Sequence, residues 1–391
     1  MGNLPDYKGG SLVNLMSSVA RALGTNKKSE RDYGELRVLP ASSLRKKRNI
    51  VLMVLDGLGF NYFKAKNKSL VLKEGLRGGI TSVFPSTTAS AITTFVTGTA
   101  PQQHAWTGWF MNLKELGMVS TVLRFNPRLG GETFTQYGVK VRDILDGPFF
   151  TEKIKVSSYL VMEEKIKNSD FTKATSKKAK KVLGYKTLEG FLRQIKKAIK
   201  FNKQRKYIYA YWPELDWLMH SYGTKGKQVE KHFDELTKSL EKFIEEIKGT
   251  NTALIITADH GLIDTTERKV VWLEKHPKLK ECLTLPLCGE PRVVYCYVRP
   301  SKTRQFEDYV KTRLNKACWL YKSEDLMRRN YFGLFKPNPK LGERIGDYIL
   351  IMKDNYIFKD CLLGKKASFN RGNHGGISEE EMKVPLIFFD L

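Results

Sequence analysis

Histidine and aspartate residues that could bind metal ions follow several apolar stretches of this 391-residue chain. Asp259 and His260 come soon after the apolar run 253–256, so both side chains can face one cation at the end of a strand. Asp216 and His220 are four residues apart after another apolar run, and this spacing places both on one face of a helix. Each pair therefore supplies part of a metal site.

Two further candidate ligands lie near the two ends of the same region. Asp56 follows the first long apolar run, 50–55, and His374 lies in a glycine-containing segment before the last one, 385–389. A single histidine after a strand is more often structural, so the prediction depends on the whole set of three aspartates and three histidines. Mixed carboxylate and imidazole ligands suit Zn²⁺ or Mn²⁺ and fit an all-oxygen Ca²⁺ site poorly. Divided evenly, six ligands make two sites, and two metal ions about 4 Å apart favour phosphoryl displacement.

A hydroxyl nucleophile for such a reaction is offered by Ser86, Thr87 and Thr88. These residues follow an expected strand at 80–84 and begin a run of small residues that is compatible with a helix. A hydroxyl group at a helix N-terminus faces free N–H groups and the positive end of the helix dipole, which favour phosphate. The same residue types are preferred helix N-caps, so one of the three can have that role alone. The residues by themselves leave open which hydroxyl reacts.

The elements that must bring these residues together are apolar strands separated by helices. Runs of strand length occur at 50–55, 80–84, 207–212, 253–257, 293–298, 348–352 and 385–389. Helical periodicity separates several of them, most clearly at 229–247. This alternation predicts an α/β fold of three layers, in which a doubly wound, mostly parallel sheet lies between helices. Ligands collect at the carboxyl ends of the strands in such sheets, so the candidate residues are expected there together.

The chain is expected to form one α/β core with an extension and an insertion. Residues 1–47 are interpreted as an N-terminal extension that packs on the core, with a short helix at 11–23. The catalytic core is predicted to comprise residues 48–110 and 207–391. Residues 111–206 interrupt the alternation and are predicted to form a Lys-rich basic cap.

Positive charge dominates the composition. The chain has 67 Lys and Arg against 41 Asp and Glu, a net charge of +26, and residues 151–206 alone carry 17 Lys and Arg against 5 Asp and Glu. A field of this sign favours phosphorylated substrates, nucleic acids and anionic membrane surfaces. The lysines of 173–181 are interpreted as solvated surface residues, with contact to a polyanion as the alternative.

The sequence also predicts the compartment. No run of about 18 uncharged apolar residues occurs, so no stable membrane insertion is expected. The five cysteines include no CxxC pair, which argues against a zinc ribbon and a secreted disulfide framework. The N-terminus does not follow the pattern of a signal peptide. A cytoplasmic protein is therefore expected.

Six short motifs bring the candidate residues into a recognisable order. They are Asp56-Gly57, Pro85-Ser86-Thr87-Thr88, Thr97-Gly98 with Pro101 to His104, Asp216 with His220, Asp259-His260-Gly261 and Asn373-His374-Gly375. As a set they resemble the alkaline phosphatase superfamily, and within it the nucleotide pyrophosphatase/phosphodiesterase (type I phosphodiesterase) family. The resemblance spans about 50 to 390 and implies an alkaline-phosphatase-like core.

The resemblance implies a role for each motif residue. Counting back from Thr97-Gly98, it makes Thr88 the nucleophile of a covalent threonine intermediate that water then hydrolyses. It also implies two metal sites, one formed by Asp216, His220 and His374 and the other by Asp56, Asp259 and His260. The cofactors expected are two divalent ions, zinc in the first place and manganese as the alternative.

One position departs from the family pattern. Nucleotide-cleaving members have an asparagine that helps hold a phosphate oxygen at the position of Trp109 here, and Asn112 lies three residues further on. Trp109, Phe110 and Asn112 are therefore the candidate substrate contacts. The aromatic residues, together with Trp106, would either stack on a nucleobase or pack inside the protein. Without a signal peptide or a disulfide framework, the chain looks like a prokaryotic-type member.

The expected function is that of a metal-dependent phosphodiesterase or nucleotide pyrophosphatase that cleaves phosphodiester or phosphoanhydride bonds. One alternative is a phosphomonoesterase or a phospholipid-headgroup phosphodiesterase with the same site. An alternative of another class is a basic nucleic-acid-binding protein with a vestigial site. The expected partner is a small phosphodiester or nucleotide substrate, with nucleic acid as a second candidate, and no oligomeric state is predicted.

Overall fold

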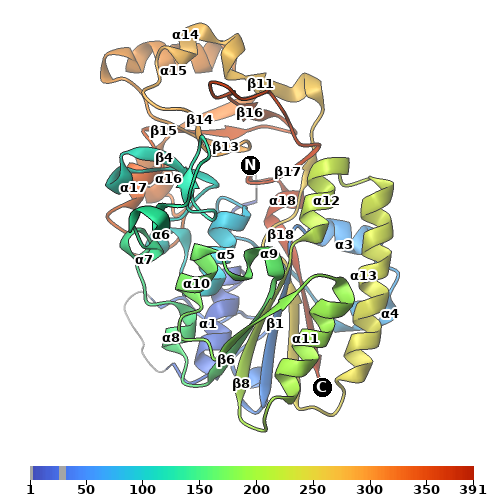
Figure 1. Ribbon diagram of the computed structural model, residues 1–391. Coiled ribbons are helices and arrows are strands. Elements are labelled where there is room, and N and C mark those ends of the chain that lie inside the picture. Colours follow the sequence, from blue (N-terminus) through green and yellow to red (C-terminus); the bar gives the residue numbers. More distant parts are fainter. Residues whose placement is uncertain (1–2, 26–31) are drawn as a thin grey trace.

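The computed structural model describes residues 3–25 and 32–391, which fold around two seven-stranded sheets (Figure 1). The order of the central sheet is β2 (Leu76–Thr81), β18 (Lys383–Asp390), β9 (Thr252–Thr257), β1 (Asn49–Leu55), β8 (Lys206–Trp212), β6 (Ser157–Glu163) and β7 (Lys181–Tyr185). Neighbouring strands from β9 to β7 run parallel, whereas β18 runs antiparallel to both β9 and β2. The predicted α/β class with a mostly parallel sheet is confirmed.

Helices cover both faces of the central sheet. On one side α1 (Leu12–Ala22) packs against α5 (Thr88–Thr97), and on the other α11 (Leu188–Lys200) packs against α13 (Lys227–Glu246) (Figure 1). Side chains alternate along β8, so Tyr209 packs against Phe95 of α5, whereas Trp212 packs against Phe191 of α11. All seven residues of β1 are buried, because a strand with helices on both faces has no side exposed to water. The helices expected at 11–23 and 229–247 correspond to α1 and α13.

The second sheet is antiparallel and lies above the central one in Figure 1. Its order is β14 (Cys318–Lys322), β15 (Tyr348–Met352), β13 (Val293–Cys296), β12 (Cys288–Glu290), β3 (Phe110–Leu113), β4 (Met118–Thr121) and β5 (Asn126–Pro127). The apolar runs 293–298 and 348–352 do form strands, but in this sheet and not in the doubly wound one. Only two residues join β12 to β13, and such a short connection permits antiparallel pairing alone.

Residues 111–206, which were expected to form one basic cap, are divided between the two sheets. β4, β5 and most of β3 belong to the antiparallel sheet, whereas β6, β7 and α11 extend the central sheet by two parallel strands. The periodic pattern is weak here because β7 is an edge strand, and charged residues are common on sheet edges. Lys173, Lys177, Lys178, Lys180 and Lys181 are exposed.

Short elements surround the space between the two sheets. They are α6 (Pro101–His104), α12 (Glu214–Tyr222), β10 (Ile263–Asp264), β17 (Gly372–Asn373) and α18 (Glu379–Met382). α14 (Pro277–Lys280) and α15 (Thr303–Arg313) lie at the far end of the antiparallel sheet (Figure 1). In the part of the chain that the structure describes, no helix is both long and apolar enough to span a membrane.

Candidate metal centre

Three central strands end side by side, and candidate ligands follow each of them. β1, β8 and β9 are paired in parallel up to their last residues and therefore end at the same edge of the sheet. Asp56 follows β1 directly, and Asp259 and His260 follow β9 after one intervening residue. α12 begins just after β8 and carries Asp216 and His220. The strand ends thus bring together residues that are up to about two hundred positions apart in the sequence.

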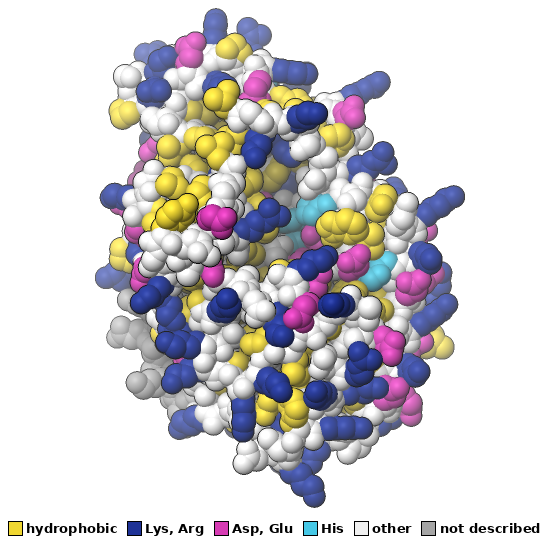
Figure 2. All heavy atoms as spheres, in the orientation of Figure 1, with side chains coloured by type: hydrophobic (Ala, Val, Ile, Leu, Met, Phe, Trp, Pro, Cys, Tyr) yellow, Lys and Arg dark blue, Asp and Glu magenta, His cyan; other side chains and the backbone are white. Residues whose placement is uncertain are grey.

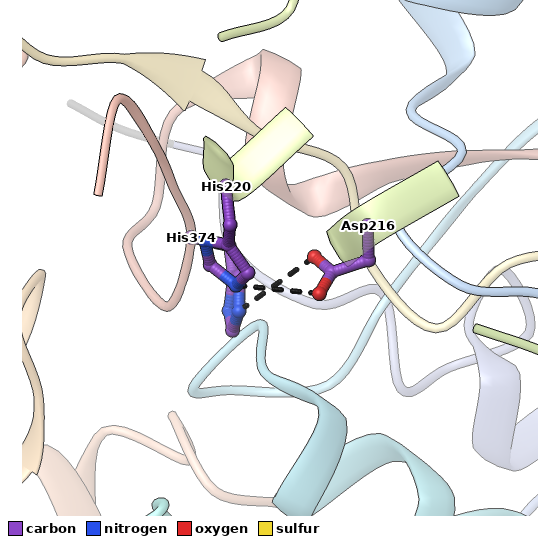
Figure 3. Close-up of side chains that lie close together, drawn as sticks. All are labelled: Asp216, His220 and His374. Atoms are coloured by element: carbon purple, nitrogen blue, oxygen red, sulfur yellow. Dashed lines mark ion pairs between the residues drawn. The ribbon is translucent and has the colours of Figure 1, made fainter. Parts of the chain in front are cut away.

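Asp216, His220 and His374 form a first group, in which the ligand atoms all lie within 4.8 Å of one another (Figure 3). Nε2 of His220 is 3.3 Å from Oδ2 of Asp216, and Nε2 of His374 is 4.0 Å from Oδ1 of the same carboxylate. The i,i+4 spacing on α12 places the first two on one helix face, and the loop after β17 supplies His374. Nδ1 of His220 lies 2.8 Å from the carbonyl oxygen of Gly372, which leaves Nε2 free for a metal ion.

Asp56, Asp216 and His260 form a second group, again within 4.8 Å. Nε2 of His260 is 3.5 Å from Oδ1 of Asp56 and 3.4 Å from Oδ2 of Asp259. Asp56, Asp259 and His260 therefore lie together. Asp216 belongs to both groups, whereas the sequence analysis had assigned each of the six ligands to one metal site only.

Several carboxylate oxygens here are buried without a hydrogen-bond partner among the described residues. They are Oδ1 of Asp56, Oδ1 of Asp216 and Oδ2 of Asp259. Burial and then the negative charges of Asp259 and Asp216 raise the pKa of Asp56 well above its usual range. Burial lowers the pKa of His374 well below its ordinary value, so its imidazole is neutral, the form that binds metals. Divalent cations would remove the cost of burying these unpaired carboxylates, so the residues present fit a two-metal centre.

The three candidate hydroxyl groups have different partners. Oγ of Ser86 donates to a backbone carbonyl in the loop after His374 at 2.8 Å, and Oγ1 of Thr87 donates to the carboxylate of Glu290 at 2.6 Å. Oγ1 of Thr88 instead lies 3.0 Å from Nε2 of His260. Among the three, Thr88 has the hydroxyl group that faces the ligand atoms.

The start of α5 adds a site for an anion beside this hydroxyl. Thr88 is the first residue of α5, and Thr87 has the extended backbone of an N-cap but makes no side-chain capping bond. The first N–H groups of a helix have no acceptor within the helix. With the hydroxyl of Thr87 engaged elsewhere, these groups and the positive end of the dipole can bind a phosphoryl oxygen.

Trp109, a candidate substrate contact, lies near the start of α5. Its backbone N–H donates to Oε1 of Glu290 at 2.7 Å, and the same oxygen accepts the hydroxyl of Thr87. The half-buried indole lies 5.8 Å from the guanidinium group of Arg124, measured to the ring centre. The position at which the family has an asparagine therefore offers an aromatic face with a positive charge over it.

The other aromatic and amide candidates have different surroundings. Phe110 and Asn112 lie on the same face of β3, because one residue separates them, and Arg128 lies 4.3 Å over the ring of Phe110. Trp106 is fully buried, with its ring 5.5 Å from that of Phe171. Of the two roles considered for the aromatic cluster, stacking on a nucleobase and packing inside the protein, the position of Trp106 agrees with packing.

Several residues that were not predicted from the sequence form hydrogen bonds to the candidate ligands or to the loops that carry them. The hydroxyl of Tyr211, on β8, donates to Oδ2 of Asp56. Arg292 forms a buried, two-pronged ion pair with Glu381, with distances of 3.0 and 2.9 Å. Oε1 of Glu381 accepts the N–H of Gly376 at 2.7 Å, and its backbone carbonyl accepts the N–H of Gly261 at 2.9 Å. One ion pair thus holds both the His374 loop and the turn after His260.

Among the candidate ligands, Asp216 and His220 are partly exposed. Figure 2 shows a hollow in the middle of this face of the molecule, with a histidine side chain at its edge and Lys and Arg side chains nearby. An anionic substrate would therefore approach the ligands past positive charge.

Comparisons with known proteins agree with this arrangement. The family model described as Type I phosphodiesterase / nucleotide pyrophosphatase matches residues 50–377. This match includes every candidate ligand and Thr88. No curated protein matches the chain.

Solved structures with a similar fold include an ectonucleotide pyrophosphatase/phosphodiesterase and a phosphonoacetate hydrolase. Murine ectonucleotide pyrophosphatase/phosphodiesterase 5 is 18% identical, with 86% of this chain and 87% of that chain covered and a TM-score of 0.64. It has also been solved as an inactive threonine-to-alanine variant in complex with AMP. Phosphonoacetate hydrolase from Sinorhizobium meliloti 1021 is 15% identical, with 88% and 90% covered and a TM-score of 0.61. At these identities the likeness concerns the fold.

Proposed function

The chain belongs to the type I phosphodiesterase/nucleotide pyrophosphatase family of hydrolases, and from this we propose that it cleaves small phosphodiester or nucleotide substrates with Thr88 as nucleophile at a two-metal centre. One observation carries the proposal. The hydroxyl of Thr88 meets buried carboxylate oxygens where β1, β8 and β9 end, and within the described part of the chain these oxygens have no hydrogen-bond partner.

The proposed ligand sets are those that the family resemblance implies. The first coincides with the group of Asp216, His220 and His374, and the second shares Asp56 and His260 with the other group and includes Asp259. One ion would be held by Asp216, His220 and His374, and the other by Asp56, Asp259 and His260. Two divalent ions bound there would act as Lewis acids that offset phosphoryl charge and lower the pKa of the attacking hydroxyl. The imidazole and carboxylate donors favour zinc, with manganese as the alternative.

The residues of the chain would position the reacting atoms. Oγ1 of Thr88 would give up its proton and attack phosphorus in line with the leaving oxygen. The bond to the leaving group breaks, the leaving oxygen takes up a proton and departs as an alcohol, and a phospho- or nucleotidyl-threonine ester forms. The free N–H groups at the start of α5 hold a phosphoryl oxygen while negative charge develops on it. Water then hydrolyses the ester and restores the hydroxyl of Thr88. The solved complex of an inactive threonine variant of the murine enzyme with AMP is consistent with a nucleotide substrate.

Hydrolysis by metal-reconstituted protein tests this proposal. The protein is stripped of metal, Zn²⁺, Mn²⁺ or Mg²⁺ is added, and the nitrophenyl ester of thymidine monophosphate is compared with nitrophenyl phosphate. We expect preference for the diester. Preference for the monoester would make the protein a phosphomonoesterase, and absence of both activities would favour the basic nucleic-acid-binding alternative.

Metal content gives an independent measure of the ligand sets. We expect Asp259→Asn to lower the number of bound metal ions, because it removes a charged ligand. Asp360→Asn is the matched control, since the side chain of Asp360 is 6% exposed but pairs with Arg128 in the antiparallel-sheet region. Equal metal content in the two variants would contradict the assignment of Asp259.

A further inference from the structure

We propose that Glu290 is a positioning residue that holds the start of α5, and with it Thr88, in the orientation needed for attack; this rests on the proposed role of Thr88. Glu290 is the last residue of β12 in the antiparallel sheet, and 6% of its surface is exposed. It joins the second sheet to the helix that carries the nucleophile.

Three segments of the chain meet at the side chain of Glu290. Its Oε1 accepts the hydroxyl of Thr87 at 2.6 Å and the backbone N–H of Trp109 at 2.7 Å. Gly375, next to the ligand His374, packs so closely that a Cβ atom there would lie 2.8 Å from Cβ of Glu290. Glu290 therefore contacts three segments: the start of α5, the segment before β3 and the His374 loop.

Burying the carboxylate of Glu290 lowers the stability of the fold, which argues that this side chain has a specific role. Glu290 forms no ion pair with the residues that the structure describes, and burying an unpaired carboxylate is destabilising. Burial raises the pKa of Glu290 to about 7. An apolar side chain of similar size would be cheaper for folding alone. The carboxylate instead provides an acceptor for two donors on different segments, which fixes their separation.

The connection to the nucleophile is short. Thr87 is the N-cap of α5, and its hydroxyl is taken by Glu290 and is not used to cap the helix. Thr88 follows directly, with its hydroxyl 3.0 Å from Nε2 of His260. A shift of the first turn of α5 would move this hydroxyl relative to the phosphorus atom, and a displacement of about 1 Å can cost on the order of a hundredfold in rate.

Steady-state kinetics of four variants with the nitrophenyl ester of thymidine monophosphate test the role. We expect Glu290→Ala to lower kcat by about a hundredfold, with KM changed only a few-fold and metal content retained. Glu290→Gln should stay within about fivefold of the wild type, because its amide oxygen still accepts both hydrogen bonds. Thr87→Val should lower kcat, and the double variant Glu290→Ala/Thr87→Val should be less impaired than the product of the single effects.

A control separates positioning from general damage to the antiparallel sheet. Glu115 follows β3 and accepts a hydrogen bond from Arg344 at 2.8 Å, so its side chain is engaged with a residue outside α5. Glu115→Gln should therefore leave kcat unchanged. If Glu290→Ala does not fold, Thr87→Val and Glu290→Gln still decide the question.

Three results would overturn the inference. They are wild-type kcat in Glu290→Ala or Thr87→Val, equal impairment of the Gln and Ala variants of Glu290, and strictly multiplicative single effects. Failure of the proposed function is distinguishable, because there Thr88→Ala would retain activity. An inactive Thr88→Ala together with a fully active Glu290→Ala would contradict only the role of Glu290.

Discussion

The protonation state of Glu290 makes the stability of this protein depend on pH near neutrality. Burial raises its pKa from 4.5 to about 7, so the folded state favours the protonated form. Stability from this preference is fully present below about pH 4.5 and is lost as the pH rises towards 7. The loss is about 3 kcal/mol, since each pKa unit corresponds to about 1.4 kcal/mol.

Denaturant unfolding of metal-free protein between pH 4.5 and 7 measures this effect. Over this range, the free energy of unfolding should fall more in the wild type than in Glu290→Gln, which has no titrating group at that position. Parallel pH profiles for the two proteins would show that Glu290 titrates normally.

Residue types and spacing predicted more of the metal centre than of its surroundings. Asp216 and His220 could be paired because a helix fixes the relation of positions four apart. The sequence alone could not decide which of Ser86, Thr87 and Thr88 is the nucleophile. The answer depends on which hydroxyl group the backbone conformation points towards His260. The resemblance to a family selected Thr88, and the geometry places that hydroxyl at the ligands.

At the scale of elements, the loop after β17 must approach β12 closely. Gly375 has φ of +112°, and a Cβ atom there would lie 2.8 Å from Cβ of Glu290. Gly375→Ala should therefore destabilise the fold by about 1–3 kcal/mol and displace His374, which lowers metal content. Thermal unfolding and metal analysis of the purified variant measure both effects.

Gly117→Ala provides the control for backbone strain. Gly117 also has a positive φ, +64°, but apart from its chain neighbours no atom of the described residues lies within 4 Å of its Cβ position. This variant should lose some stability and keep its metal ions. Normal metal content in Gly375→Ala would show that the loop tolerates the extra atom.

Individual elements were predicted better than the sheets that they join. β1, β8 and β9 are continuous apolar strands, and their ends define the site. The runs at 293–298 and 348–352 look similar in sequence, yet they pair antiparallel in the second sheet, because pairing depends on connections and long-range packing. β6 and β7 were assigned to a cap because many lysines lie in and beside them, so that the continuous apolar run typical of a core strand is not evident.

At the scale of the whole molecule, the net charge of +26 should speed the encounter with anionic substrates. Raising the ionic strength from 0.01 to 0.15 M shortens the screening length from about 30 to about 8 Å. We expect kcat/KM for the thymidine ester to fall about three- to tenfold over this range, while kcat at saturation changes little. If kcat/KM did not depend on the salt concentration, the positive charge would not be accelerating the binding of this substrate.

Under the proposed function, the strand ends of the central sheet supply most of the metal ligands. Glu290 and Arg292, at the β12–β13 hairpin of the antiparallel sheet, then hold the start of α5 and the His374 loop. The most direct test of this account is the hydrolysis rate of Thr88→Ala with its metal content measured alongside. Thr93→Ala is the matched control, because the hydroxyl of Thr93 lies on the same helix and donates only to the carbonyl of Ala89, at 2.7 Å. We predict that Thr88→Ala keeps its metal ions and loses activity by about a thousandfold or more, while Thr93→Ala stays active. Hydrolysis by Thr88→Ala at the rate of the control would contradict the account.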